Sequence, residues 1–160
     1  MARDEAYRRA EQKIEEARWL KARKLDLSSE KPWEKALTEL PESLSQLTQL
    51  RELNLSGNDL VVLPDLLGEL MQLQALDLRN NRLTALPVSL GQLMQLQELN
   101  LSRNQLTVLP ATVGRLAQLQ TLNLYSNKLV VLPEWLGQLT QLQELDLSEN
   151  QLRALPASLG

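Results

Sequence analysis

The sequence predicts an α/β solenoid. Short coils stack so that a parallel sheet lines the concave side, irregular or 3-10 structure forms the convex side, and an α-helix caps the N-terminal end. Three observations predict this fold. Leucine supplies most of the apolar content, whereas aromatic residues make up 3% and phenylalanine is absent. One segment recurs every 23 residues. The first 20 or so residues show helical spacing of apolar side chains.

The repeated segment is clearest from residue 50 onward. Five consecutive copies begin at Leu50, Leu73, Leu96, Leu119 and Leu142. They read LRELNLSGNDLVVLP, LQALDLRNNRLTALP, LQELNLSRNQLTVLP, LQTLNLYSNKLVVLP and LQELDLSENQLRALP. Counted from the first leucine, leucine stands at offsets 0, 3, 5, 10 and 13, asparagine at offset 8 and proline at offset 14.

Each conserved offset has a physical reason within the coil. Leucines at offsets 3 and 5 point to the same side of an extended chain, because side chains alternate along a strand. The asparagine follows that strand at a turn, where its amide can both accept from and donate to backbone groups that stacking leaves unpaired. We therefore expect a buried polar ladder of Asn58, Asn81, Asn104, Asn127 and Asn150.

The second half of each coil is set by proline and a return segment. Proline ends any strand at the same place in each copy. The return segment then supplies one further core residue from the convex side, namely Leu67, Leu90, Val113, Leu136 and Leu159. A single coil cannot bury its own leucines, so stability comes from the contacts between neighbouring coils.

These columns resemble the leucine-rich-repeat family, in its bacterial-type 23-residue form, over about residues 37–160. The resemblance implies a horseshoe-shaped solenoid that binds protein partners. More narrowly, RDEAYRRAEQKIEEA and LTELPESLSQLTQL resemble the N-terminal region of bacterial Roco-type proteins, in which a repeat domain precedes a Ras-like GTPase. The GxxxxGK[ST] phosphate-binding motif does not occur here, so nucleotide hydrolysis is not carried over.

The N-terminal part divides into a helical cap and a degenerate first repeat with an insertion, together residues 1–36, ahead of the array at 37–160. The helix covers residues 2 to about 20, with an apolar stripe of Tyr7, Ala10, Ile14, Ala17 and Leu20. In the first repeat Glu30 takes the asparagine position. Pro32 fits the first position of a short helix in the inserted segment, which forms either a helix or a loop. We expect Trp33 to pack there together with Trp19; the alternative is that Trp33 contacts a partner.

The last coil predicts an exposed apolar surface. A coil without a following coil or polar cap exposes its leucines, here Leu145, Leu147, Leu152, Leu155 and Leu159. Three interpretations of this surface are open. The chain is part of a longer one, the array was engineered, or two copies pair through these C-terminal ends in a homodimer. The high identity of the copies favours engineering, although a recently duplicated bacterial array is equally regular.

Composition excludes several classes of function. The chain has no cysteine and no histidine, which rules out thiolate nucleophiles, imidazole bases and the common zinc ligand sets. A net charge of -3 gives no attraction to nucleic acid. The charged opening residues lack the apolar stretch of a secretory signal, and no apolar run is long enough to span a membrane. We expect a cytoplasmic, non-enzymatic protein without metal or cofactor.

A partner is expected to bind the concave sheet, where the variable residues next to the inward leucines project. Arg79, Arg103 and Tyr125 interrupt columns that are otherwise small and polar, and both residue types are common interface anchors. The candidate binding residues are Asp77, Arg79, Asn100, Arg103, Asn123, Tyr125 and Asp146. Nothing in the sequence places carboxylates such as Glu98 and Glu144 in a cleft with a second functional group, so they predict neither a glycosidase pair nor a metal site.

The leading hypothesis is therefore a protein-interaction module or scaffold that binds a protein or peptide through its concave surface. One alternative is a scaffold, engineered or truncated, that self-associates through its C-terminal end. The other is the repeat region of a larger GTPase.

Overall fold

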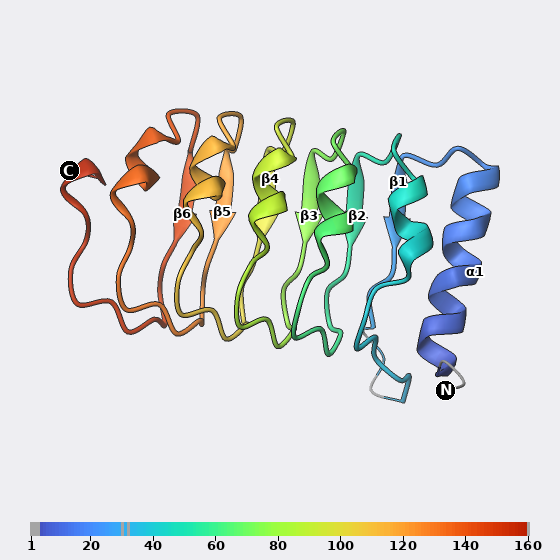
Figure 1. Cartoon of the computed structure of the whole chain (residues 1–160). Coiled ribbons are helices and arrows are strands. Elements are labelled where there is room, and N and C mark those ends of the chain that lie inside the picture. The colour runs from blue at the N-terminus through green and yellow to red at the C-terminus, as the bar shows by residue number, and fades with distance from the viewer. Residues whose placement is uncertain (1–3, 30, 32, 160) are drawn as a thin grey trace.

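The computed structural model describes residues 4–29, 31 and 33–159, and of Leu159 the backbone alone. The chain forms a single row of coils that starts at an N-terminal helix (Figure 1). Six short strands make one parallel sheet in sequence order. They are β1 (Lys24–Asp26), β2 (Glu52–Asn54), β3 (Ala75–Asp77), β4 (Glu98–Asn100), β5 (Thr121–Asn123) and β6 (Glu144–Asp146).

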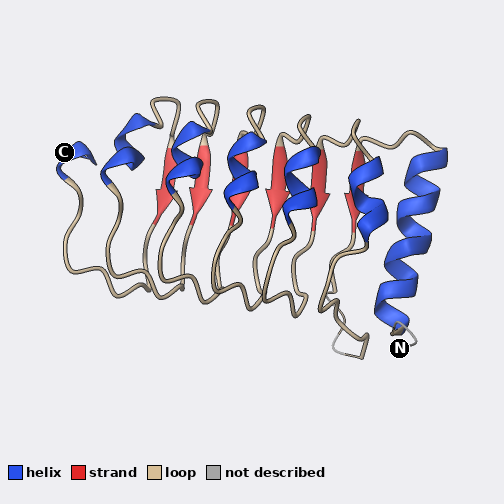
Figure 2. Ribbon diagram, viewed as in Figure 1, coloured by secondary structure: helices blue, strands red, loops and turns tan. Residues whose placement is uncertain are grey.

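Short 3-10 helices occupy the side of each coil opposite its strand (Figure 2). The first five each begin directly after a proline, whose fixed φ suits the extended residue before a helix. They are η1 (Glu42–Gln46), η2 (Asp65–Glu69), η3 (Val88–Gln92), η4 (Ala111–Arg115), η5 (Glu134–Gln138) and η6 (Ala157–Leu159). The predicted solenoid, with its parallel sheet and 3-10 convex side, is confirmed.

The core is a stack of leucines held in register. The middle leucine of each strand pairs with the middle leucine of the next, as Leu76 does with Leu53 and Leu99. The leucines of the central coils are almost completely buried, and so is the return-segment residue of each, such as Leu90. Burial of this repeated aliphatic surface between coils is the main driving force for the fold.

The asparagines of the five copies form a ladder of hydrogen bonds, buried from Asn58 to Asn127 and half-buried at Asn150. Asn104 is 7% exposed, and its Oδ1 accepts from the backbone N–H of Leu83 in the preceding coil at 3.0 Å. Its Nδ2 donates to the carbonyls of Leu78 and Leu101, at 2.9 and 3.1 Å. Asn58, Asn81, Asn127 and Asn150 repeat this pattern, so each amide ties two coils together.

The N-terminal helix α1 (Glu5–Trp19) covers the first coil. Asp4 caps it by accepting from the Tyr7 backbone N–H at 2.9 Å. The predicted stripe is buried at Tyr7, Ala10, Ile14 and Ala17. The prediction was wrong for Leu20, which is exposed, because the helix ends at Trp19 and the chain turns away at Lys21 with a φ of 49°. No helix in the described part of the chain has the length and apolarity to cross a membrane.

The expected packing of the two N-terminal tryptophans was also wrong. Trp33 is 79% exposed and Trp19 is 81% exposed. Trp19 follows the buried Ala17 by two helical positions, which places it on the opposite face of α1. Around Trp33 the described residues form a turn, in which the Glu34 N–H donates to the Lys31 carbonyl at 3.0 Å. Glu30 and Pro32, on which two further expectations rest, lie outside the described residues.

Candidate functional site

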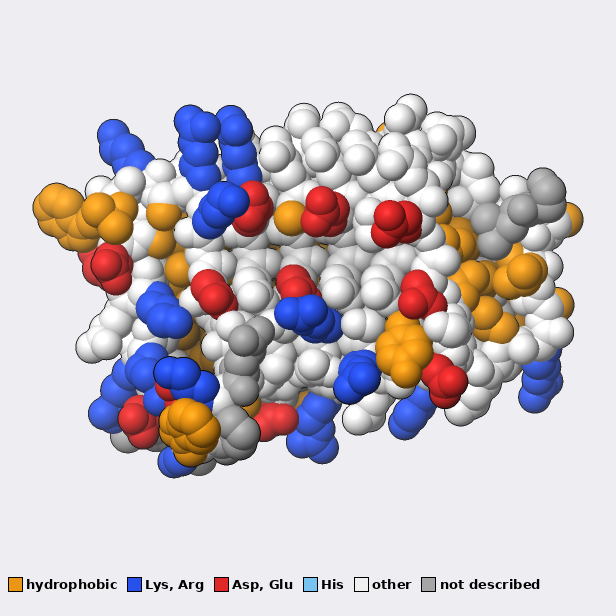
Figure 3. Space-filling view, turned by 180° about the vertical axis from the view of Figure 1, so that it is seen from behind, with side chains coloured by type: hydrophobic (Ala, Val, Ile, Leu, Met, Phe, Trp, Pro, Cys, Tyr) orange, Lys and Arg blue, Asp and Glu red, His pale blue; other side chains and the backbone are white. Residues whose placement is uncertain are grey.

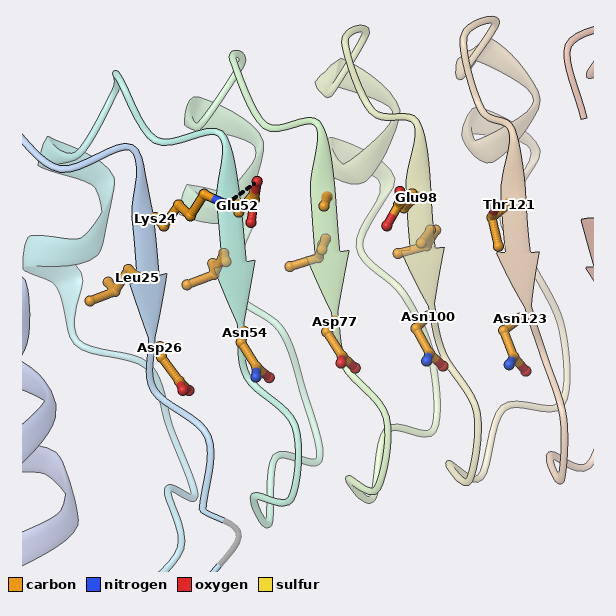
Figure 4. A pocket seen from close by; sticks show the side chains of 14 residues that line it. Lys24, Leu25, Asp26, Glu52, Asn54, Asp77, Glu98, Asn100, Thr121 and Asn123 are labelled. Atoms are coloured by element: carbon orange, nitrogen blue, oxygen red, sulfur yellow. Dashed lines mark ion pairs between the residues drawn. The ribbon is translucent and has the colours of Figure 1, made fainter.

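Two rows of side chains flank a groove that crosses the sheet face (Figures 3 and 4). The inward leucine of each strand separates one outward residue before it from one after it. The upstream row consists of Lys24, Glu52, Ala75, Glu98, Thr121 and Glu144. The downstream row consists of Asp26, Asn54, Asp77, Asn100, Asn123 and Asp146. The groove has a volume of about 510 Å³ and runs from β1 to β5.

Every residue of the downstream row has a structural role. Its Oδ1 accepts from the backbone N–H two residues later, at 2.9–3.0 Å in all six coils. This bond closes an Asx turn that leads the chain out of the strand. Aspartate and asparagine make this turn more strongly than serine or threonine, which accounts for their presence at every position of the row. Sequence reasoning treated Asp77, Asn100, Asn123 and Asp146 solely as binding candidates and missed this constraint.

The turn then passes through left-handed backbone. Asn80, Arg103, Ser126 and Glu149 have φ of 54–55°, and Gly57 has a φ of 71°. A positive φ in a residue other than glycine often marks a functional site. Here the same conformation recurs in five successive coils, so it belongs to the coil geometry.

A second hollow adjoins the groove on the downstream side and brings the three irregular candidates together. Its volume is about 560 Å³, and Arg79, Arg103 and Tyr125 all line it. The Arg103 guanidinium lies 5.8 Å from the centre of the Tyr125 ring, within the range of a cation–π contact. Arg79 pairs through Nε with Asp77 Oδ2 at 3.3 Å. Asn100 and Asn123 line both spaces, whereas Asp146 lines neither.

The upstream row was missing from the sequence-based candidates, although the period of two along each strand could have found it. Residues on either side of an inward leucine project from the same face of the sheet. In this row the exposed Glu52, Glu98 and Glu144 alternate with the half-buried Ala75 and Thr121. The groove therefore has acid side chains on one wall at every second strand.

The groove is acidic along its length. Four of the six carboxylates in the two rows line it, namely Asp26, Glu52, Asp77 and Glu98. Among the described residues, the groove has one cation, Lys24, which pairs with Glu52 at 2.9 Å across the surface. Burial by itself raises the pKa of Asp26, but hydrogen bonds from the Ser28 hydroxyl and N–H and the charge of Lys13 bring it below its ordinary value. The hydroxyl and N–H of Ser148 lower the pKa of Asp146. Both carboxyls are ionised at neutral pH.

The leucines of the last coil are less buried than those of the central coils. Leu145, Leu147 and Leu152 are half-buried, although their counterparts in the central coils are fully buried, and Leu155 is 63% exposed. The side chain of Leu159 lies outside the described residues. Within the described ranges, no three aspartates or glutamates gather in a way that could hold a metal ion.

The coil geometry is shared with proteins of known structure. The chain is 35% identical to a leucine-rich repeat protein of Leptospira interrogans, with a TM-score of 0.65, and covers 89% of its own length and 47% of that chain. It is 37% identical, with a TM-score of 0.77, to the ectodomain of the Arabidopsis thaliana receptor kinase GASSHO1/SCHENGEN3, solved with CASPARIAN STRIP INTEGRITY FACTOR 2. That match covers 89% of this chain and 18% of the ectodomain.

A plant peptide hormone receptor, RGFR1 in complex with RGF2, is 32% identical over 71% of this chain and 19% of the receptor, with a TM-score of 0.64. This chain thus spans less than half the length of each of these proteins. No curated protein sequence matches it. The family model described as "Leucine-rich repeat region" matches residues 21–128 and 65–160. Since these two matches span the whole array, and its coils superimpose on solved repeat proteins, the chain belongs to the leucine-rich repeat family, whose repeat domains are usually non-catalytic.

Proposed function

We propose that this chain is a binding module that holds a protein or peptide partner on its sheet face, with the hollow lined by Arg79, Arg103 and Tyr125 as the centre of contact. The observation that carries the proposal is the convergence of these three side chains, from three successive coils, beside an open groove. Arginine and tyrosine supply large contact area together with directed hydrogen bonds, and they dominate the energetics of many interfaces. Two similar solved proteins are plant receptors in complex with their partners.

Selection from a random peptide library displayed on phage, followed by affinity measurement, tests the proposal. We expect selected peptides to bind the Arg79→Ala, Tyr125→Ala double variant at least about tenfold more weakly than the unmodified chain, since anchor residues each contribute about 1–2 kcal/mol or more. Gln92→Ala, an exposed change in η3 on the opposite side, is the control and should leave the dissociation constant unchanged. Equal losses in both variants would place the binding surface elsewhere.

Self-association is a second candidate function, favoured by the half-buried leucines of the last coil. β6 is an edge strand, and an apolar surface beside an unpaired strand edge favours pairing with another chain. We propose a homodimer through this end. Light scattering over a concentration series should show a dimer that Leu152→Asp abolishes and that Val88→Asp, the same kind of change on exposed η3, leaves intact. A monomer at every concentration contradicts this proposal.

The finer resemblance to bacterial Roco-type proteins supports a third proposal, that the array is the repeat region of such a protein. It rests on the sequences of residues 3–17 and 37–50. Cytoplasmic localisation stays a prediction from the composition of the sequence.

A further inference from the structure

We infer that the partner of the sheet face is a basic polyproline II segment that carries lysine or arginine at every third residue and lies along the groove. This inference rests on the proposed function and names the chemistry of the partner. Three features of the groove support it: the sign of its charge, the spacing of its acids and the donors on its opposite wall.

The acids of the upstream row repeat at a fixed interval. Glu52, Glu98 and Glu144 occupy equivalent positions on β2, β4 and β6, because the strands pair in continuous register. Neighbouring strands lie about 4.8 Å apart, so these carboxylates repeat about every 9.6 Å across the sheet. Glu52 and Glu98 line the groove, and Glu144 lies one strand beyond its end. All three side chains are exposed, and the small Ala75 and Thr121 between them leave room for a chain to approach.

This interval matches polyproline II better than an extended β-strand. A polyproline II helix has three residues per turn and rises about 3.1 Å per residue, so every third side chain returns to the same side after about 9.3 Å. An extended β-strand places every second side chain on one side, at intervals of about 6.7 Å, and turns its third residue away. Of these two extended conformations, polyproline II is the one whose side-chain interval matches the spacing of the three glutamates.

The opposite wall offers hydrogen-bond donors of fixed orientation. The Oδ1 atoms of Asn54, Asn100 and Asn123 accept from backbone N–H groups in the Asx turns. The amide nitrogen of each side chain is therefore the group left to donate. A polyproline II segment has no internal hydrogen bonds, so its carbonyls are free to accept them. The glutamates of the upstream row can therefore pair with the basic side chains of such a peptide, while the asparagine amides of the downstream row donate to its carbonyls.

The existing ion pairs leave this surface available to a cation. Lys24 pairs with Glu52, but both side chains are substantially exposed, and exposed pairs contribute little to stability. Glu98, at the centre of the row, is exposed and lies between the small residues of β3 and β5. We therefore expect the charge of Glu98 to contribute most to binding of the peptide.

Fluorescence anisotropy with two labelled nonapeptides tests the inference. One peptide has lysine at positions 1, 4 and 7 and proline elsewhere; the other has the same composition with its three lysines adjacent. We expect the spaced peptide to bind about tenfold more tightly in low salt, and Glu98→Gln to remove most of that preference. Glu69→Gln, the same change at an exposed position of η2 on the opposite side, is the matched control and should have no effect.

Equal affinity of the two peptides, no measurable binding of either, or equal effects of Glu98→Gln and Glu69→Gln would overturn the inference. Failure here is distinct from failure of the proposed function. If peptides selected from the displayed library lose affinity in the Arg79→Ala, Tyr125→Ala variant but show no three-residue spacing of basic residues, the sheet face is the binding surface and the partner chemistry is wrong.

Discussion

Replacing Asn104 with alanine is expected to lower the free energy of unfolding by about 2–3 kcal/mol, because one buried backbone N–H loses its only side-chain partner and two buried carbonyls each lose one of their two amide donors. The Leu83 N–H and the carbonyls of Leu78 and Leu101 bond to this amide in the central part of the stack. Water cannot easily replace the amide there, since Asn104 is 7% exposed. Equilibrium urea unfolding followed by circular dichroism measures the loss.

Asn150→Ala provides the matched comparison. Asn150 makes the same bonds, to the Leu129 N–H and the carbonyls of Leu124 and Leu147, but in the last coil and half-exposed. Solvent can reach these groups once the amide is removed, so we expect a loss of about 1 kcal/mol. If both variants lose the same free energy of unfolding, the contribution of each asparagine to stability does not depend on how deeply it is buried.

Replacing Gly91 with valine is expected to cost about 3 kcal/mol, and more if the coils cannot separate, because overpacking strains closely packed backbones. A Cβ on Gly91 would lie 2.6 Å from the backbone oxygen of Thr112 in the next coil and 2.7 Å from its Cβ. The oxygen belongs to the backbone and cannot rotate away. Thermal unfolding should show a melting temperature lower by about 6–12 °C, from about 2–4 °C per kcal/mol in a chain of this size.

Val88→Ala is the control for this substitution, because Val88 lies in the same 3-10 helix, η3, and is largely exposed. Its melting temperature should stay within about 2 °C of that of the unmodified chain. A Gly91→Val variant as stable as this control would show that neighbouring coils can move apart at little cost.

The requirement for glycine in this part of the coil depends on distances between coils that the sequence does not state. Gly68, Gly91, Gly114 and Gly137 occupy the same place in four coils, whereas Ser45 occupies it in the first. At Gly68 and Gly91 an added Cβ would meet a backbone oxygen of the next coil within 2.6 Å, but at Gly114 the nearest neighbour is the ring of Trp135 at 3.1 Å. The same residue, glycine, therefore repeats, but the neighbouring atoms that exclude a larger side chain differ from coil to coil.

The sequence by itself determined the repeated core of the array. The solenoid fold was predicted correctly from the 23-residue period and the leucine columns, because each residue repeats in the same local setting and aliphatic burial between coils leaves one consistent way to stack them. The sequence also indicated why a polar residue lies inside the stack. Asn104 and its equivalents bond to backbone groups that the turn of each coil leaves without a backbone partner.

Only the tertiary structure decided what the surface presents. It placed Trp19 and Trp33 in solvent, assigned the Oδ1 of Asp77 and its equivalents to Asx turns, and brought Arg103 over Tyr125 from the neighbouring coil. Exposed side chains are not fixed by burial, and their positions depend on the spacing between coils and on which polar atoms the backbone has already bonded. For that reason the repeat pattern predicts the scaffold, while the charge and shape of the groove come from the way the coils approach one another.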